Sequence, residues 1–310
     1  QKRVEANTKK SARHSCMLLL AALVWGVAFV AQSEGLNYVG AFTFNTCRFI
    51  LGGAVLIQCI YFLHGRKDSA WQTLSEKEKK EQTRMGIIGG ICCGCILCLA
   101  SCLQQFGIAQ TTVGKAGFIT TLYIIIVPFM GLFLKKKIGI NIWISAVIAA
   151  VGMYFLCITE SFSIGAGDRL VLMCSVVFSV HILVIDHFSP KADGVVISCV
   201  QFFTAGVIAS VLMLLFEHPS VSAVIAAAAP ILYAGVMSCG VGYTLQVVAQ
   251  NGVDPTVASL LLSLESVFSV LAGWMLLGQK LSGRELFGCV LVFAAVLLVQ
   301  IPTEKLFHTA

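Results

Sequence analysis

Three ionisable side chains, Glu265, Arg48 and His181, interrupt long apolar stretches and are the first candidates for chemistry. A charged side chain at the centre of a hydrocarbon layer costs about 3 kcal/mol on insertion scales. Residues of this kind are kept for a structural or a functional reason. For each of the three, both reasons have to be considered.

Glu265 lies near the middle of the apolar run 255–277. As a functional group it could bind a cationic substrate or a proton, being protonated in one state of the protein and ionised in another. As a structural group it would be a permanently protonated or hydrogen-bonded packing residue. The residues alone leave both interpretations open.

Arg48 and His181 allow similar alternatives. Arg48, near the start of the run 38–63, could pair with a substrate carboxylate or with Glu265, or extend its guanidinium to the lipid headgroups. The sequence favours the headgroup or a structural bond for Arg48. His181, within the run 168–187, could relay protons, and the alternative is a hydrogen-bonded core histidine.

Uncharged polar and aromatic residues complete the candidate binding site. Gln104 and Gln246 stand at equivalent places of an internal repeat described below, where amides either join helices or contact a ligand. Further residues could line a site for the uncharged part of a substrate, although aromatic residues in lipid spans are commonly core. These are Tyr123, Trp25, Thr120 and Tyr243.

The 13 cysteines offer no evident redox or metal chemistry. Cys95 and Cys98 form a Cys-x-x-Cys pair in a cysteine-rich apolar run, but neither a second such pair elsewhere in the chain nor a nearby histidine completes a metal-ligand set. We interpret these thiols as small packing side chains. We expect no metal site and no cofactor.

The elements that position these residues are predicted from composition. Of the 310 residues, 58% are hydrophobic and 12% are charged, with a mean hydropathy of +0.90. Crossing a bilayer takes about 20 apolar residues as a helix, and continuous apolar runs exclude the alternating strands of a barrel. The sequence therefore predicts an all-α membrane protein with ten transmembrane helices, near 16–34, 38–63, 85–107, 112–134, 138–158, 168–187, 194–216, 223–249, 255–277 and 283–301.

Basic residues predict the orientation of these spans. Most of the 21 Lys and Arg residues fall on the side that also holds both chain ends, including Lys135, Lys136 and Lys137. The positive-inside rule then places both termini in the cytoplasm, and we expect the plasma (inner) membrane of a bacterium. Because the basic residues sit in short blocks between apolar spans, nucleic acid is not expected as a partner.

The chain contains an internal repeat. An offset of 142 residues pairs Leu103 with Leu245 and Gln104 with Gln246, and the register continues without a gap to Leu134 and Leu276. An offset of 153 pairs the first helices, as in Phe49 with Phe202.

Each copy has five spans. Because five is odd, the second copy enters the membrane from the opposite side, which predicts a 5+5 inverted-topology repeat with units 16–158 and 168–301. Two oppositely oriented copies can expose a central site alternately to either side.

Three segments resemble the drug/metabolite transporter superfamily, and within it the EamA-type permeases with two repeated domains. They are WGVAFV at 25–30, AGFITTLYIIIVP at 116–128 and ASLLLSLESVFSVLAGWMLLGQ at 258–279. The resemblance covers nearly the whole chain. It implies a basket in which helices 1 to 4 and 6 to 9 surround a cavity while helices 5 and 10 stand outside.

The chain departs from the family pattern at three positions. The usual Glu after the Gly that closes the fourth helix of each repeat is Lys136 in the first copy and Gln279 in the second. The usual Pro after Glu265 is Ser266. These departures concern helix ends and kinks, and they put the geometry of gating in doubt but not the fold.

The function hypothesis is a secondary transporter, and more specifically an exporter of small organic metabolites such as amino acids, with protons as a candidate coupling ion. A membrane-embedded thiol oxidoreductase and a ligand sensor without transport are the alternatives. No Walker-type loop, Ser-His-Asp arrangement or His-Glu-x-x-His motif occurs, so we expect no enzyme activity. A single Arg48 is poor provision for a phosphate. The expected partners are a small-molecule substrate and the lipid bilayer, and the protein could be a monomer or a homodimer.

Overall fold

Every regular element in the described part of the chain is a helix, and no strand occurs there. The computed structural model describes residues 2–65, 70–111, 113–135, 138–157, 165–277 and 282–299. Lys136 and Gln279 lie outside these residues. The all-helical prediction is confirmed.

Eight candidate membrane spans are present among the described residues, by length and apolar composition. They are Ala12–Gly35, Ala41–Gly65, Glu76–Ile108, Ala116–Phe133, Ala166–Phe188, Gly194–Phe216, Ala228–Gln250 and Pro255–Ala272. Two of the ten expected spans, 138–158 and 283–301, coincide with the shorter helices α6 (Ile140–Cys157) and α14 (Gly283–Val299).

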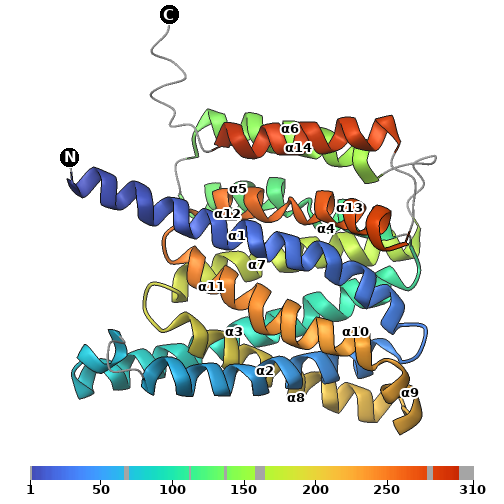
Figure 1. Ribbon diagram of the computed structural model, residues 1–310, viewed down its shortest axis with the longest axis horizontal. Helices are drawn as coiled ribbons and strands as arrows, with labels where there is room; N and C mark the ends of the chain where they lie inside the picture. Colours follow the sequence, from blue (N-terminus) through green and yellow to red (C-terminus); the bar gives the residue numbers. More distant parts are fainter. Residues whose placement is uncertain are drawn as a thin grey trace, which may run out of the picture.

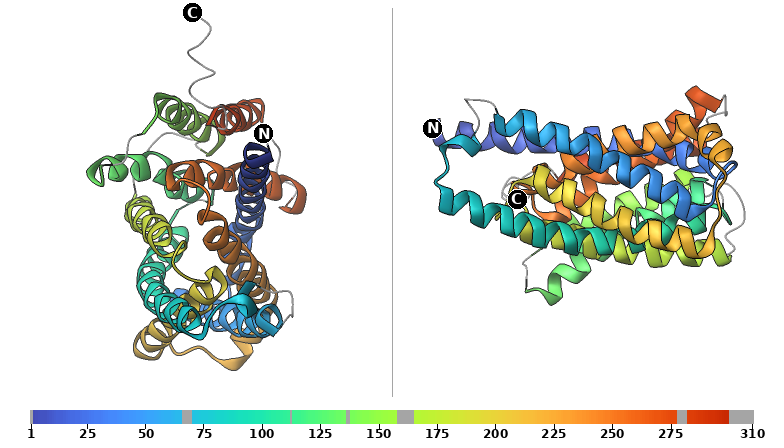
Figure 2. Two further views of the ribbon diagram at one scale, coloured as in Figure 1. Left: turned by 90° about the vertical axis from the view of Figure 1, so that its left-hand side faces the viewer. Right: turned by 90° about the horizontal axis from the view of Figure 1, so that it is seen from below.

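The long helices run nearly parallel or antiparallel and stack in layers (Figure 1). They are α1 (Lys2–Gly35), α2 (Ala41–Gly65), α3 (Glu76–Ile108), α7 (Ala166–Phe188) and α8 (Gly194–Phe216). α6 packs on α14 at one edge of the bundle and α2 packs on α8 at the opposite edge, while α3 contacts both α7 and α8. The end-on view in Figure 2 shows α1 and α7 between these two edges.

Helix starts follow local capping chemistry. α3 begins with a capping box, in which Ser75 Oγ accepts from Glu78 N over 3.3 Å and Ser75 N donates to Glu78 Oε2 over 2.8 Å. Asp193 caps α8 by accepting from Val195 N over 2.7 Å. A short 3₁₀ turn, η1 (Ala70–Thr73), precedes α3.

Two expected spans are broken in the middle, which corrects the prediction of continuous helices over 112–134 and 255–277. The first consists of α4 (Val113–Thr120) and α5 (Tyr123–Phe133), and the second of α12 (Pro255–Leu262) and α13 (Glu265–Leu277). The breaks fall at Thr121–Leu122 and Ser263–Leu264, which the 142-residue offset pairs with each other.

Hydroxyl side chains bond preceding carbonyls at both breaks. Thr121 Oγ1 donates to Gly117 O over 2.9 Å, and Ser263 Oγ donates to Leu260 O over 2.7 Å. Ser and Thr hydroxyls that bond a preceding carbonyl compete with the helical ladder and bend helices. At Ser266, where the family has Pro, the hydroxyl donates to Ser263 O over 2.8 Å, so it also bonds a carbonyl at this break.

The expected span 223–249 is irregular too. It comprises α9 (Val221–Ala226), α10 (Ala228–Leu232), a π-helical segment η2 (Tyr233–Tyr243) and α11 (Thr244–Gln250). π-helical turns are rare and occur frequently at functional sites. η2 carries Ser238 and Tyr243 toward the centre of the molecule.

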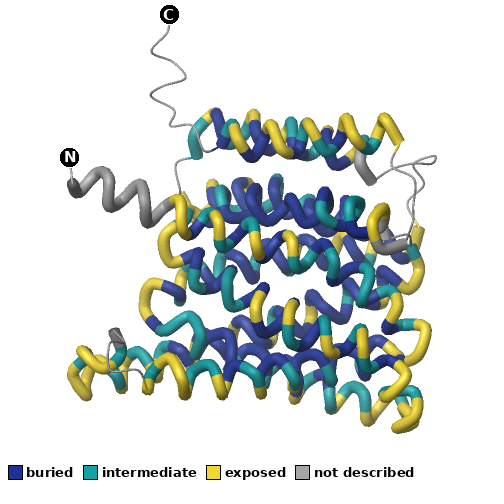
Figure 3. Tube along the Cα trace, viewed as in Figure 1, coloured by how far each residue is buried: buried dark blue, intermediate teal, exposed yellow. Residues whose placement is uncertain are grey.

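The two broken spans lie side by side and run in opposite directions, because α12 contacts α5 while α13 contacts α4. Buried positions concentrate inside the bundle, and exposed positions follow its outer faces and its ends (Figure 3). Many exposed side chains on the outer faces are large and apolar, such as Ile57 and Val207, as a lipid-facing surface requires.

One close helix contact depends on a glycine. A Cβ atom built at Gly26 of α1 would lie 2.5 Å from Phe268 Cβ and 2.8 Å from the Phe268 carbonyl carbon on α13. Only a residue without a Cβ atom allows the two helices to approach so closely. This contact holds α13, and with it Glu265, against α1.

Candidate functional site

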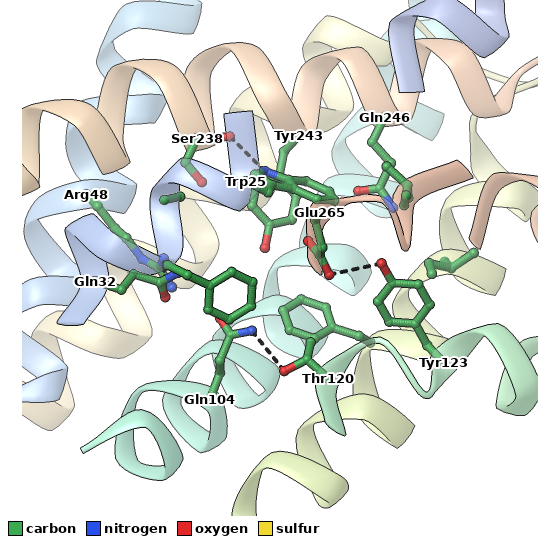
Figure 4. Close-up of a pocket in the computed structure, with 15 residues that line it drawn as sticks. Trp25, Gln32, Arg48, Gln104, Thr120, Tyr123, Ser238, Tyr243, Gln246 and Glu265 are labelled. Carbon is green, nitrogen blue, oxygen red and sulfur yellow. Dashed lines mark hydrogen bonds between the residues drawn. The ribbon is translucent and has the colours of Figure 1, made fainter. Parts of the chain in front are cut away.

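A pocket at the centre of the bundle collects polar side chains from α1, α2, α3, α4, α5, η2, α11 and α13 (Figure 4). Its volume, with the open space at its mouth included, is about 490 Å³. The lining residues are Trp25, Ala28, Phe29, Gln32, Arg48, Gln104, Thr120, Tyr123, Phe178, Ile182, Ser238, Tyr243, Gln246, Leu262 and Glu265.

Eight of the nine residues predicted for the site line this pocket, and His181 does not. That they bind a substrate or an ion stays a prediction. The ring of His181 is fully buried beside the pocket, with Nε2 3.1 Å from Gln201 Oε1 and its centroid 6.1 Å from that of Tyr243. The structure therefore fits the core interpretation of His181 better than the relay.

Glu265 and Tyr123 are placed by the two helix breaks. Each is the first residue of its half-helix, Tyr123 in α5 and Glu265 in α13. Tyr123 Oη donates to Glu265 Oε1 over 3.0 Å, and both side chains are almost completely buried. A helix N-terminus favours negative charge, and a phenolic donor also favours the ionised carboxylate, whereas burial opposes it.

Arg48 lies in the pocket and not at the headgroups. Its side chain is 2% exposed, and its guanidinium lies over the Phe49 ring at 4.8 Å from the centroid. Nη1 donates to Gln32 Oε1 over 3.2 Å. Of the alternatives considered for Arg48, this conformation fits a structural bond within the protein and not an extension to the headgroups. Among the described residues Arg48 forms no ion pair with Glu265.

The two glutamines related by the repeat both face the pocket (Figure 4). Gln104 Nε2 donates to Thr120 Oγ1 over 3.5 Å. The side-chain oxygen of Gln246 is buried and has no hydrogen-bond partner. Buried polar atoms are almost always paired, so Gln246 Oε1 is open for a ligand or a water molecule.

Aromatic rings form one wall. Trp25 and Tyr243 pack with ring centroids 4.6 Å apart, and Trp25 Nε1 donates to Ser238 O over 3.4 Å. Tyr243 also packs on Phe202 of α8, with ring centroids 5.7 Å apart. α8 thus supports the wall although it contributes no lining residue, and α6 and α14 contribute none either.

The cysteine-rich run gives the structure no cluster for metal binding. All twelve cysteines in the described chain are free thiols, with Cys95 exposed and Cys98 buried. No group of three His, Cys, Asp or Glu side chains that could hold a metal occurs within the described residues. Cys157 is among the positions whose side chains are not described.

Sequence reasoning missed several lining residues, of which Gln32 is the most informative. Gln32 is a polar residue inside the expected span 16–34, and its side chain holds Arg48 while its carbonyl accepts from Gln105 Nε2 over 3.2 Å. Its polarity within an apolar span was the available signal. The apolar lining residues carried no signal that separates them from the core.

The fold and the site define a multi-pass helical membrane protein with a central pocket that is lined by both polar and apolar side chains. Residues 13–158 and 165–301 match the EamA-like transporter family, and the chain belongs to that family. It is therefore a transmembrane transporter, which lies in lipid and binds a small-molecule substrate.

Relatives agree with this assignment. An uncharacterized transporter of Archaeoglobus fulgidus is 29% identical over 285 residues, covering 92% of this chain and 84% of that protein. The uncharacterized transporter YoaV of Bacillus subtilis is 20% identical over 286 residues, covering 91% of this chain and 94% of that protein. A solved crystal structure of a protein 18% identical has the same fold, with a TM-score of 0.74 over 96% of this chain and 99% of the other.

Proposed function

We propose that the protein is a secondary carrier that exports small organic metabolites, such as amino acids or related compounds, by alternating access. The carrier is proton-coupled through Glu265. The observation that carries the proposal is the central pocket, in which one buried carboxylate stands where two broken, antiparallel spans meet.

Alternating access rests on a 5+5 inverted repeat with units 16–158 and 168–301, and the helix contacts support that division. α1 contacts α13 as α7 contacts α5, and α3 contacts α7 as η2 contacts α1. In the two units α1 is equivalent to α7, α5 to α13 and α3 to η2. Each contact therefore has an equivalent in which the two units have changed places. The family match in two segments, 13–158 and 165–301, supports the same division. On this scheme α6 and α14 complete the count of ten transmembrane helices.

Irregular helix positions support a site near the bilayer midplane. Carriers with inverted repeats bind substrates at discontinuous helices, whose freed backbone and half-helix ends face the site. Here both breaks and the π-helical segment η2 border the pocket. A ligand there contacts elements from both units and so senses their relative motion.

Glu265 is the group for the coupling proton. Charge buried in a membrane protein is stabilised by protonation or by a cationic partner. A carboxylate that takes a proton in one state and the cationic group of a substrate in another makes the two compete for one site. Such competition couples outward movement of substrate to inward movement of protons.

The orientation places both termini on the cytoplasmic side of a bacterial plasma membrane. The positive-inside bias of the first unit supports this. In Figure 1 the start of α1 lies at the same end of the bundle as the start of α3, which carries Lys77, Lys79 and Lys80.

The test is uptake and efflux in proteoliposomes over a metabolite panel, with and without a pH gradient. Wild type is compared with Glu265→Gln and with Glu81→Gln, a control that makes the same chemical change at an exposed position of α3. We expect the response to the gradient to vanish in Glu265→Gln and to persist in the control. An unchanged response in folded Glu265→Gln would exclude this residue as the proton carrier.

A further inference from the structure

We propose that Arg48, held in place by Gln32, is a subsite that binds the carboxylate group of the substrate and makes the pocket prefer monocarboxylates over the corresponding amides and amines. The inference rests on the proposed function, since it takes the central pocket as the substrate site. The proposal adds that Arg48 and Gln32 determine substrate specificity and set the orientation of the bound substrate.

The guanidinium of Arg48 is a buried cation with spare hydrogen-bonding capacity. Arginine presents five N–H donors in a planar fork. Among the described residues its one hydrogen-bond partner is Gln32, and the buried Nε has none. The Phe49 and Phe44 rings lie 4.8 Å and 5.8 Å from Cζ, so they hold the fork without satisfying its donors.

A buried cation needs a negative partner, and the described residues supply none within ion-pair distance of Arg48. Removing a charge from water without a compensating partner is costly. Arg48 also lines the pocket, where a ligand can reach it. A ligand anion at this place supplies the missing counter-charge together with charge-assisted hydrogen bonds.

The setting selects a monocarboxylate. Arg48 is the single cationic side chain among the lining residues, and its polar neighbour Gln32 is neutral. One guanidinium matches the charge and the two oxygens of a carboxylate. A phosphate group carries more charge and would leave part of it uncompensated in a buried pocket.

The repeat explains why the subsite exists once. The 153-residue offset pairs Arg48 with Gln201, whose side-chain oxygen is bound to His181 outside the pocket. The 142-residue offset pairs Glu265 with Tyr123. Each unit therefore contributes one charge at a position where the other unit has a neutral side chain.

Figure 4 shows Arg48 and Gln32 on one side of the pocket and Glu265 with Tyr123 on the other. A zwitterion fits this arrangement, with its carboxylate on Arg48 and its ammonium group toward Glu265. The apolar part of such a ligand then packs on the Trp25 and Tyr243 rings.

The experiment measures binding to the purified full-length protein, from the shift of its thermal unfolding midpoint. The probes are L-leucine, L-leucinamide, 3-methylbutylamine and 4-methylpentanoate, which share one apolar group and differ in charge. The variants are Arg48→Gln, Arg48→Lys and Gln32→Glu. Arg169→Gln, at an exposed position of α7, is the matched control.

Wild type and Arg169→Gln should bind leucine and 4-methylpentanoate at least about tenfold more tightly than the probes without a carboxylate, the range expected for a charge-assisted hydrogen bond. Arg48→Gln should lose this preference. Arg48→Lys should keep part of it, because the charge remains and the fork is lost. Gln32→Glu should also lose this preference, because the new carboxylate would bind the Arg48 guanidinium in place of the substrate. This variant keeps Arg48, so it tests the subsite even if the Arg48 variants fail to fold.

Equal binding of carboxylates and amides by wild type, or no binding of any carboxylate probe, would overturn the subsite. So would an unchanged preference in Arg48→Gln. Competition by chloride or inorganic phosphate that matches the carboxylates would show a general anion site instead. Gradient-driven flux without a carboxylate preference would contradict the subsite proposal but not the transport proposal. Carboxylate-selective binding without flux of any metabolite would contradict the transport proposal but not the subsite proposal.

Discussion

Tyr123 Oη donates to Glu265 Oε1 over 3.0 Å, and these two residues occupy the same position in the two copies of a repeat 142 residues apart. Each begins the second half of a broken span. The hydrogen bond therefore joins the two units at their equivalent points, inside the central pocket.

Replacing both partners tests whether this bond is energetically significant. Tyr123→Phe leaves a buried carboxylate without its hydrogen-bond donor, which should lower the free energy of unfolding by about 1–3 kcal/mol. Combined with Glu265→Leu, which removes the acceptor, the effects should not add, and we expect an interaction energy of about 0.5–3 kcal/mol from a double-mutant cycle. The free energy of unfolding is measured in detergent for wild type, the two single variants and the double variant. Tyr61→Phe, at an exposed tyrosine, is the control, and additive effects would mean that the bond carries no weight.

A second contact between the units lies at one end of α2 and α8. Glu217, at the C-terminal end of α8, accepts from Phe42 N over 3.0 Å and from Thr43 N over 2.8 Å at the start of α2. The 153-residue offset pairs Glu217 with His64, whose Nε2 lies 2.8 Å from Asp193 at the other end of the same helix pair. Both ends of the α2–α8 pair are thus joined by side chains.

Removing the Glu217 carboxylate should weaken the start of α2. Because it satisfies free helix N–H groups and lies at the positive end of the helix dipole, Glu217→Ala should lower the free energy of unfolding by about 1–2 kcal/mol. Glu217→Gln should cost less, since one oxygen can still accept. Unfolding measurements with Glu34→Gln as an exposed control check this. Equal stability of Glu217→Ala and wild type would show that the cap is not needed.

Substitution of glycine by alanine should have different effects at Gly26, where α1 approaches α13 closely, and at Gly117, where no other atom is near. Gly26→Ala should destabilise by about 1–3 kcal/mol, because its Cβ would overlap Phe268. Gly117→Ala in α4 meets nothing within 4 Å and should be neutral or stabilise by up to about 1 kcal/mol through helix propensity. Thermal unfolding of the two variants is the measurement, and a neutral Gly26→Ala would show that α1 and α13 can separate freely.

How far the sequence predicts the site can be judged from particular residues. The 142-residue offset places Tyr123 opposite Glu265 and Gln104 opposite Gln246, and all four line the pocket. Polar residues in apolar spans are stabilised when they face the interior of the bundle and contact one another. Equivalent positions in the two copies therefore predict that these four residues lie close together.

Other features were out of reach of the sequence pattern. The breaks at Thr121 and Ser263 coincide with hydroxyl–carbonyl bonds that hydropathy does not register. Hydropathy does not give the direction of the Arg48 side chain either, which is set by its contacts with Gln32 and Phe49. A histidine within an apolar span, such as His181, suggests a site residue. Only the packing of the structure shows that His181 bonds to Gln201 beside the pocket.

Counterflow in proteoliposomes tests most directly whether the central pocket is the substrate path. Ala28 lines the pocket and is 1% exposed, so Ala28→Phe should fill the path, while Ala54→Phe adds the same ring at an exposed position of α2. We predict saturable flux in wild type and Ala54→Phe that is stimulated by the metabolite on the opposite side, and loss of that flux in Ala28→Phe. Unsaturable flux, or equal counterflow in folded Ala28→Phe, would contradict a carrier that works through this pocket.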